Sequence, residues 1–234
     1  MPRLNATEVT AIHFYGAGCT PQQIPMMKRL LEEVFPSART VEVAGDMLGA
    51  ARALCGNHPG IVCILGTGSN SCYYDGERIV SNVSPLGYIL GDEGSGAYLG
   101  KRLVGDCLKG QLPDRLCRRF LERFQLTPAD IIEQVYRRPL ANRFLASLSC
   151  FLGENRQEPE IHALLVECFS AFVRRNLLSY PAGELYCTGS IAYYYATELQ
   201  EAAAAFGLRV ERILQKPMEG LIAYHTRLQN EQTL

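Results

Sequence analysis

The chain has 234 residues, of which 47% are hydrophobic and 20% are charged. This composition excludes a disordered chain and is typical of one large globular domain or two small ones. The formal net charge is −1, and no apolar run is long enough for a membrane span. We therefore expect neither nucleic acid nor a membrane as a partner.

The cysteines indicate a reducing environment rather than disulfide bonds. Their number, nine, is odd, and no Cys-x-x-Cys pair indicates zinc or an iron–sulfur cluster. Cys63, Cys150 and Cys168 lie in apolar contexts, as buried free thiols do. We therefore expect free thiols in a cytoplasmic protein. The four histidines are scattered without the spacing of a metal site, and we assign them no role.

The hydrophobic pattern changes repeatedly between strand-like and helical runs along the chain. Strands are predicted at residues 9–15, 40–43, 61–65, 71–74, 78–83, 184–187 and 208–213. Helices are predicted at residues 24–34, 46–55, 97–178 with several breaks, 191–206 and 221–229. This alternation indicates an α/β protein. A change of composition at residues 57–60 predicts a domain boundary there, which divides the chain into residues 1–59 and 60–234.

A glycine-rich turn follows the buried-type strand at residues 61–65. It reads Gly66-Thr67-Gly68-Ser69-Asn70 and leads into another strand. It lacks the third glycine and the helix of a dinucleotide fingerprint, and also the Gly-Lys-Ser/Thr of a Walker A loop. Its N–H groups and hydroxyls could bind phosphate oxygens, whereas the alternative is an ordinary hairpin turn. A second strand end of this kind, Thr188-Gly189-Ser190, favours the phosphate site.

Three acidic residues are candidates for work on a polar substrate. Asp46 follows a strand and begins a helix, so it is either an N-cap or a carboxylate at a ligand-binding strand end that could accept a proton. Asp92 and Glu93 lie between Gly91 and Gly94. They form either a solvated turn or, since their neighbours are apolar, a pair of charges that needs partners.

These segments together resemble a known family. Val43-Ala-Gly-Asp46, Leu65-Gly-Thr-Gly-Ser-Asn70, Gly87-Tyr-Ile-Leu-Gly-Asp-Glu-Gly-Ser95 and Cys187-Thr-Gly-Ser190 occur in the order found in the N-acetylglucosamine kinase-like group. This group belongs to the actin-like ATPase superfamily and is often placed with the ATPases that activate benzoyl-CoA reductase. The resemblance implies an actin-like, ribonuclease H-like α/β fold of two domains with a cleft between them. The 97–178 helices would be an insertion in the second domain.

The resemblance also implies a function and a set of site residues. The expected reaction is ATP-dependent phosphorylation of an amino sugar, with N-acetylglucosamine at its 6-hydroxyl as the acceptor and with Mg²⁺ required. By comparison with the family, Asp46 is the catalytic base. The nucleotide and phosphate residues are Gly66, Thr67, Gly68, Ser69, Gly189 and Ser190, and the sugar contacts are Asn70, Gly87 and Asp92. A homodimer is expected, with residues 97–178 as a possible interface.

The start of the chain departs from the family. Family members open with a β-hairpin bearing Asp-x-Gly-x-Thr, whose Asp helps to hold Mg²⁺, and this motif is absent here. We therefore expect residues 1–59 to be the remnant of a truncated first domain, because a sheet without its first strands exposes a bare edge. The metal ligands stay unknown. Two alternatives remain open, a non-catalytic nucleotide- or sugar-binding remnant and an activase-type ATPase of the same superfamily.

Overall fold

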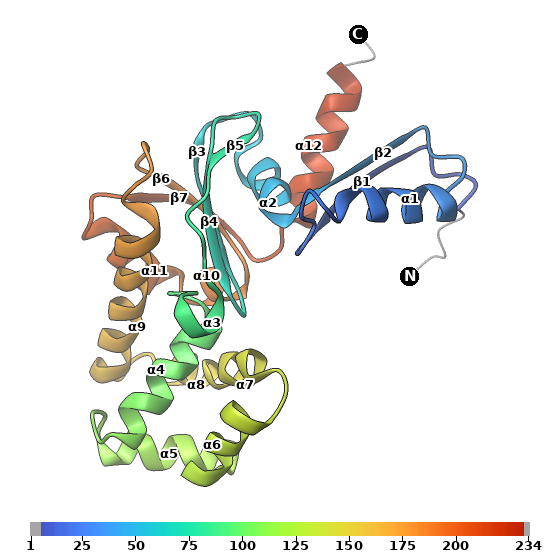
Figure 1. Cartoon of the computed structure of the whole chain (residues 1–234). Helices are drawn as coiled ribbons and strands as arrows, with labels where there is room; N and C mark the ends of the chain where they lie inside the picture. The colour runs from blue at the N-terminus through green and yellow to red at the C-terminus, as the bar shows by residue number, and fades with distance from the viewer. Residues whose placement is uncertain (1–5, 232–234) are drawn as a thin grey trace.

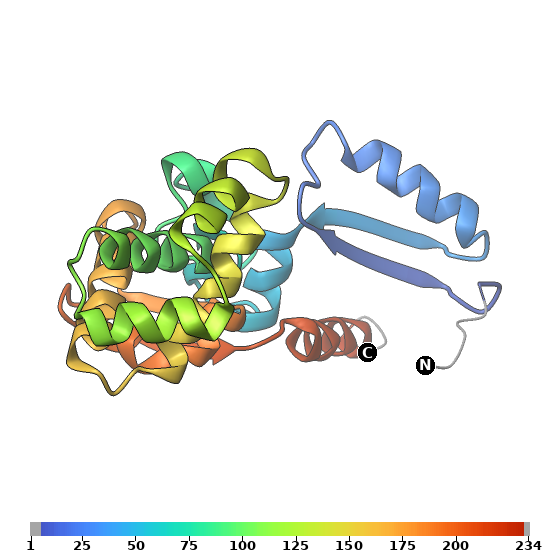
Figure 2. The ribbon, with the colours of Figure 1, turned by 90° about the horizontal axis from the view of Figure 1, so that it is seen from below.

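The strands of the computed structural model form two separate sheets (Figure 1). The structure describes residues 6–231. The first five residues of the predicted domain 1–59 and the last three of the predicted domain 60–234 therefore lie outside the described part. In the first sheet, β1 (Ala11–Gly16) pairs in parallel with β2 (Thr40–Gly45), and the crossover helix α1 (Ile24–Val34) joins them. Figure 2 shows that this β1–α1–β2 unit projects to one side of the rest of the chain.

The second sheet has five strands in the order β5-β4-β3-β6-β7. Its strands are β3 (Gly60–Leu65), β4 (Ser69–Tyr74), β5 (Ile79–Ser81), β6 (Glu184–Thr188) and β7 (Arg209–Leu214). The central strand β3 is antiparallel to β4 and parallel to β6. The sheet is therefore mixed, and the carboxyl ends of β3, β6 and β7 meet at one edge, where ligand sites of open α/β sheets lie.

Helices cover both faces of the five-stranded sheet. Alternate residues of β3 point to opposite faces, so Cys63 belongs to the larger core and Val62 to the smaller one. The larger core lies against α4 (Gly96–Leu108), α9 (Pro159–Phe172) and α11 (Ala196–Ala204). The smaller core lies under α2 (Asp46–Cys55), which in turn packs on α12 (Met218–Glu231). The remaining helices are α3 (Gly87–Leu90), α5 (Asp114–Phe124), α6 (Pro128–Arg137), α7 (Ala141–Leu148), α8 (Cys150–Glu154), the π-helix Val173–Leu177 and α10 (Ser190–Tyr194).

The short connection between α2 and β3 positions a candidate residue. Residues 56–59 join the end of α2 to the start of β3, and α2 packs on β3. The helix therefore runs back along the strand, and its first residue, Asp46, lies toward the carboxyl end of β3. This is the end at which the glycine-rich turn begins.

The structure confirms the predicted α/β class and corrects several elements. Asp46 is not the N-cap of α2, because Gly45 occupies that position with extended backbone and Asp46 is the first helical residue. The helix predicted at residues 191–206 is interrupted at Tyr195 and forms α10 and α11. The short helix α3 was not predicted. None of the helices within residues 6–231 combines the length and apolar character of a bilayer span. The domain boundary at residues 59 and 60 stays a prediction.

Candidate functional site

The glycine-rich turn is attached to the start of α4. Within the turn, the N–H of Gly66 donates to the carbonyl of Gly68 at 2.9 Å. The carbonyls of Gly66 and Thr67 accept from the N–H groups of Gly96 and Ala97, at 2.8 and 3.1 Å. These bonds satisfy N–H groups in the first turn of the helix, which have no partners inside it. The turn is therefore held at a fixed place beside α4, and the Thr67 side chain is left exposed.

Asp92 lies directly against this turn. The N–H of Ser69 donates to its carboxylate, and its own N–H donates to the carbonyl of Pro85 at 2.9 Å. Asp92 has a φ of 53°, which is uncommon for a residue other than glycine and is found at functional sites. Burial raises the pKa of its carboxyl, an effect that the Ser69 N–H opposes. The structure thus joins Asp92 to the predicted phosphate turn.

Glu93 has partners that the sequence did not reveal. Its side chain is 8% exposed and pairs with Arg175 at 2.6 Å, and it accepts from Nδ2 of Asn176 at 3.3 Å. Both partners come from the π-helix Val173–Leu177, a rare conformation that often marks functional sites. Of the two alternatives for the acidic pair, the partnered one is correct.

The remaining predicted sugar residues lie near Asp92 to different degrees. Asn70 belongs to β4 and is separated from Ser69, which donates to Asp92, by one peptide bond. Gly87 begins α3 with a φ of +73°, and no atom lies within 4 Å of the position of a β-carbon. Asn70 and Asp92 are therefore brought together, whereas Gly87 is exposed and touches the site through the 85–92 backbone alone.

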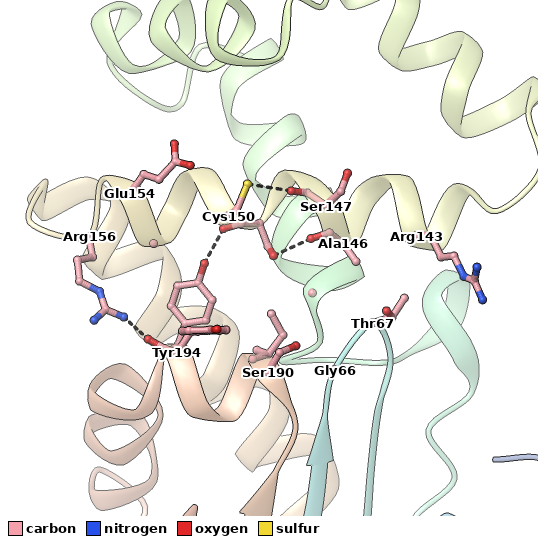
Figure 3. Close-up of a pocket in the computed structure, with 15 residues that line it drawn as sticks. Gly66, Thr67, Arg143, Ala146, Ser147, Cys150, Glu154, Arg156, Ser190 and Tyr194 are labelled. Carbon is pink, nitrogen blue, oxygen red and sulfur yellow. Dashed lines mark hydrogen bonds between the residues drawn. The ribbon is translucent and has the colours of Figure 1, made fainter. Parts of the chain in front are cut away.

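A pocket of about 770 Å³ opens on the other side of the turn. Figure 3 shows α7 and α8 on one side of it, with the turn and α10 on the other. Of the six predicted nucleotide residues, Gly66, Thr67 and Ser190 line it, whereas Gly68, Ser69 and Gly189 do not. Gly189 has a packing role instead, since a β-carbon there would lie 2.2 Å from the carbonyl oxygen of Leu65.

The two ends of the pocket differ in chemistry. Arg143 lies beside Thr67 at one end and is exposed, and its guanidinium has no ion-pair or hydrogen-bond partner among the described residues. At the other end, Arg156 donates to the backbone carbonyl of Tyr194 and pairs with Glu198 at 3.4 Å. One end thus offers an unpaired guanidinium, that of Arg143. The other end offers the aromatic ring of Tyr194 beside a guanidinium whose charge is neutralised by Glu198.

Most residues of the far wall of the pocket carry no signal in the sequence. Arg143, Ser147, Glu154, Arg156 and Tyr194 belong to no motif, and α7 and α8 were predicted only as helical. The placement of Cys150 was wrong, because its thiol is exposed and lines the pocket. The three consecutive tyrosines that follow Ser190 were the one local signal for an aromatic surface here.

Asp46 makes only a local contact. Its Oδ1 accepts from the N–H of Met47 at 2.9 Å, and no other site residue in the described part of the chain bonds to it. The carboxylate is half-buried and lies toward the turn, since α2 runs antiparallel to β3. Its second oxygen therefore remains available to a ligand.

Two histidines that received no role meet between the β1–β2 unit and α12. The rings of His13 and His225 stack with centroids 3.8 Å apart, and Glu42 accepts from His13 at 2.8 Å. Within residues 6–231 these three side chains are the one group of His, Cys or carboxylates that could hold a metal ion. Arg52 already pairs with Glu42 at 2.6 Å, and stacked rings cannot both direct a nitrogen at one ion. The geometry therefore fits an ion-pair network.

Comparison with protein-family models and with curated proteins finds no match. Solved structures do match. A putative N-acetylglucosamine kinase from Porphyromonas gingivalis is 52% identical, with a TM-score of 0.91 over 94% of this chain and 78% of that one. A second, from Chromobacterium violaceum, is 22% identical, with a TM-score of 0.68 over 96% and 78%. A ROK family glucokinase from Streptomyces griseus, in complex with glucose and AMPPNP, is 13% identical, with a TM-score of 0.53 over 84% and 70%. These similarities confirm the actin-like α/β fold class.

Proposed function

The chain belongs to the N-acetylglucosamine kinase-like family of sugar kinases, and from this premise we propose that it transfers the γ-phosphoryl group of ATP to an amino sugar. N-acetylglucosamine is the proposed acceptor and its 6-hydroxyl the proposed site of transfer. The family supports a sugar kinase, and the named sugar is our inference.

One observation carries this proposal, namely that a single turn separates two binding regions. Gly66 and Thr67 line the pocket, whereas Gly68 and Ser69 contact Asp92. A ligand phosphate at the turn would therefore lie between a nucleotide in the pocket and a sugar beside Asp92 and Asn70. The pocket volume, about 770 Å³, is within the range of roughly 300–1,000 Å³ typical of small-molecule sites.

The pocket suits a nucleotide with its phosphates toward the turn. The hydroxyls of Thr67 and Ser190 can donate to phosphate oxygens, and the unpaired Arg143 supplies positive charge at the same end. Tyr194, at the opposite end, offers a ring on which a base can stack. Gly68, Ser69 and Gly189 would shape the turn and its support rather than line the pocket.

Asp46 is the proposed base. Phosphoryl transfer needs little covalent chemistry from the protein, so positioning and charge neutralisation dominate the rate. The free oxygen of Asp46 could accept the proton of the attacking hydroxyl while Asp92, Asn70 and the Gly87 backbone hold the sugar. We assign no protein ligand to the Mg²⁺ that accompanies ATP, because the described residues bring no suitable group of ligands together at the turn.

The test is an assay of ADP release with ATP, Mg²⁺ and a panel of hexoses, hexosamines and N-acetylhexosamines. Stimulation by N-acetylglucosamine above the other sugars supports the proposal. Stimulation by a different sugar would reassign the substrate. Calorimetric binding of sugar and AMPPNP without any turnover would support a non-catalytic binding protein instead.

A further inference from the structure

The side-chain amides of Asn70 and Asn82 are linked by a hydrogen bond next to the glycine turn. Asn82 follows β5, and its Nδ2 donates to Oδ1 of Asn70 at 2.9 Å and to the carbonyl of Ser71 at 2.5 Å. The N–H of Ser71 also donates to Oδ1 of Asn70, at 2.9 Å. The backbone of Ser71 thus contacts both amides, through its N–H and its carbonyl.

These contacts determine which way each amide points. A backbone N–H can only donate, so the Asn70 atom that faces it is the oxygen. A backbone carbonyl can only accept, so the Asn82 atom that faces Ser71 is the nitrogen. Turning either amide over would place like groups together. Oδ1 of Asn70 is therefore fully used, and its Nδ2, a donor, has no partner among the described residues.

We propose that Asn82 is a positioning residue that holds Asn70 as a hydrogen-bond donor toward the sugar. The inference rests on the proposed function, in which Asn70 contacts the sugar. It adds which partner donates the hydrogen bond in that contact. The sugar atom that meets Asn70 must be an acceptor, a hydroxyl or carbonyl oxygen, and a protonated amine at that point is disfavoured because two donors would meet.

A second contact keeps the backbone in place when the Asn82 side chain changes. The hydroxyl of Tyr180 accepts from the N–H of Val83 at 2.8 Å and donates to the carbonyl of Ser71 at 3.0 Å. It therefore ties the segment after β5 to β4 without touching either amide. Tyr180→Phe loosens the same segment while Asn70 keeps its orientation, which makes it a matched control.

The test measures sugar and nucleotide affinity separately by titration calorimetry on the full chain. Asn82→Asp removes the donor and places a carboxylate against Oδ1 of Asn70. Because two acceptors would then meet, the Asn70 amide should turn over and direct its nitrogen at residue 82, away from the sugar. We expect the affinity for N-acetylglucosamine to fall about tenfold or more, and the affinity for AMPPNP to stay within about twofold. Asn82→Ala should lose less, about threefold, because no carboxylate draws the amide round. Tyr180→Phe should melt earlier but bind the sugar as the wild type does.

The outcomes separate this inference from the proposed function. Sugar affinity unchanged in both Asn82 variants would overturn the inference alone, as would an equal loss in Tyr180→Phe, which would mean that Asn82 only stiffens the segment. A wild-type chain that binds no hexosamine would overturn the proposed function, and the inference with it. If Asn82→Asp fails to fold in a thermal melt, Asn82→Ala decides by the same comparison with Tyr180→Phe.

Discussion

The Asp92 carboxylate and the Gly68 backbone are packed so closely that a β-carbon at position 68 would lie 2.8 Å from Oδ2 of Asp92. Residue 68 is therefore glycine for a reason that concerns the sugar side of the turn and not only the phosphate side. The turn therefore has two proposed roles, in binding phosphate and in positioning Asp92. A change in the turn backbone would displace the Asp92 carboxylate, which is proposed to hold the sugar.

Gly68→Ala should displace Asp92 and weaken sugar binding more than nucleotide binding. We expect a loss of about tenfold for N-acetylglucosamine by calorimetry, because a contact under 3 Å forces the carboxylate to move. Gly105→Ala is the control, since open space surrounds a β-carbon on that residue. A larger loss for AMPPNP than for the sugar would mean that the turn acts chiefly as a phosphate grip.

Asp46→Asn should lower turnover strongly without unfolding the protein. The amide oxygen can still accept from the N–H of Met47, so the melting temperature should stay nearly unchanged. The rate of ADP release should fall by about 10²–10⁴-fold, the usual contribution of a positioned base. Asp46→Ala, which also loses the local hydrogen bond, should melt earlier. If Asp46→Asn and the wild type released ADP at equal rates, Asp46 would have a structural role only.

Arg143→Ala should weaken nucleotide binding and leave sugar binding unchanged. The guanidinium has no partner in the described structure, so its removal breaks no ion pair, and stability should not change. A charge-assisted hydrogen bond to phosphate contributes about 1.5–3 kcal/mol, so we expect AMPPNP affinity to fall by roughly tenfold to a hundredfold. Arg137→Ala, an exposed arginine on α6, is the control. Equal AMPPNP affinity in the two variants would remove Arg143 from the site.

Asp92→Asn should stabilise the protein at neutral pH. Because burial raises the pKa of Asp92 in the folded state, ionisation disfavours folding at pH values above this pKa. The cost disappears as the pH falls below the ordinary carboxyl value of about 3.9. Asp92→Asn should therefore melt above the wild type at pH 7, with a gap that closes toward pH 4.

Asp75 provides the opposite sign for comparison. The N–H groups of Arg78 and Glu77 lower the pKa of its exposed carboxyl, so ionised Asp75 favours the fold. Asp75→Asn should melt at or below the wild-type temperature at pH 7. If both variants moved in the same direction, burial would not be the cause of the Asp92 effect.

The contact between β1 and α12 should weaken in acid. Tyr15 accepts from Arg52 at 2.5 Å, and its hydroxyl forms a hydrogen bond of 2.8 Å with Nε2 of His225. A neutral His225 with its hydrogen on Nδ1 accepts the Tyr15 proton at Nε2, and an added proton on Nε2 ends that arrangement. Burial, and then His13, lower the pKa of His225; Arg52 lowers it further, and Glu42 opposes them. The unfolded chain therefore takes up this proton more readily, and the free energy of unfolding should fall as the pH drops below about 6.5.

Urea unfolding between about pH 5 and 7.5 measures this effect. His225→Gln keeps an acceptor for Tyr15 and cannot gain the proton, so part of the pH dependence should disappear. His58→Gln, at an exposed histidine, is the control. A wild-type slope retained in His225→Gln would place the titrating group elsewhere.

The sequence could predict what depends on short-range pattern. The alternation of strands and helices and the glycine turn after Leu65 follow from neighbouring residues, although the turn covers residues 66–68 and β4 begins at Ser69. The apolar neighbours of Glu93 indicated that it needs partners, but not that Arg175 and Asn176 supply them. The sequence could not predict that Gly189 packs against the Leu65 carbonyl, because the two residues are more than a hundred positions apart in the chain. It missed Arg143 and Tyr194 for the same reason, since the helices that carry them meet the turn only in the folded chain.

Two local errors have local causes. An N-cap was one of the two alternatives for Asp46 because aspartate favours that position, but the chain enters α2 one residue earlier, at Gly45. Cys150 was predicted to be buried because its sequence neighbours are apolar. Those neighbours, Phe151 and Leu152, do point into the core, and the thiol lies on the opposite side of a five-residue helix.

The most direct test of the central claim is identification of the product. The chain is incubated with ATP, Mg²⁺ and ¹³C-labelled N-acetylglucosamine and followed by ¹³C and ³¹P NMR, with Asp46→Asn in parallel. We predict that the C6 resonance moves and shows coupling to phosphorus in the wild-type sample, whereas the variant sample does not change. Unaltered sugar in the wild-type sample, or phosphate attached at another carbon, would contradict the account.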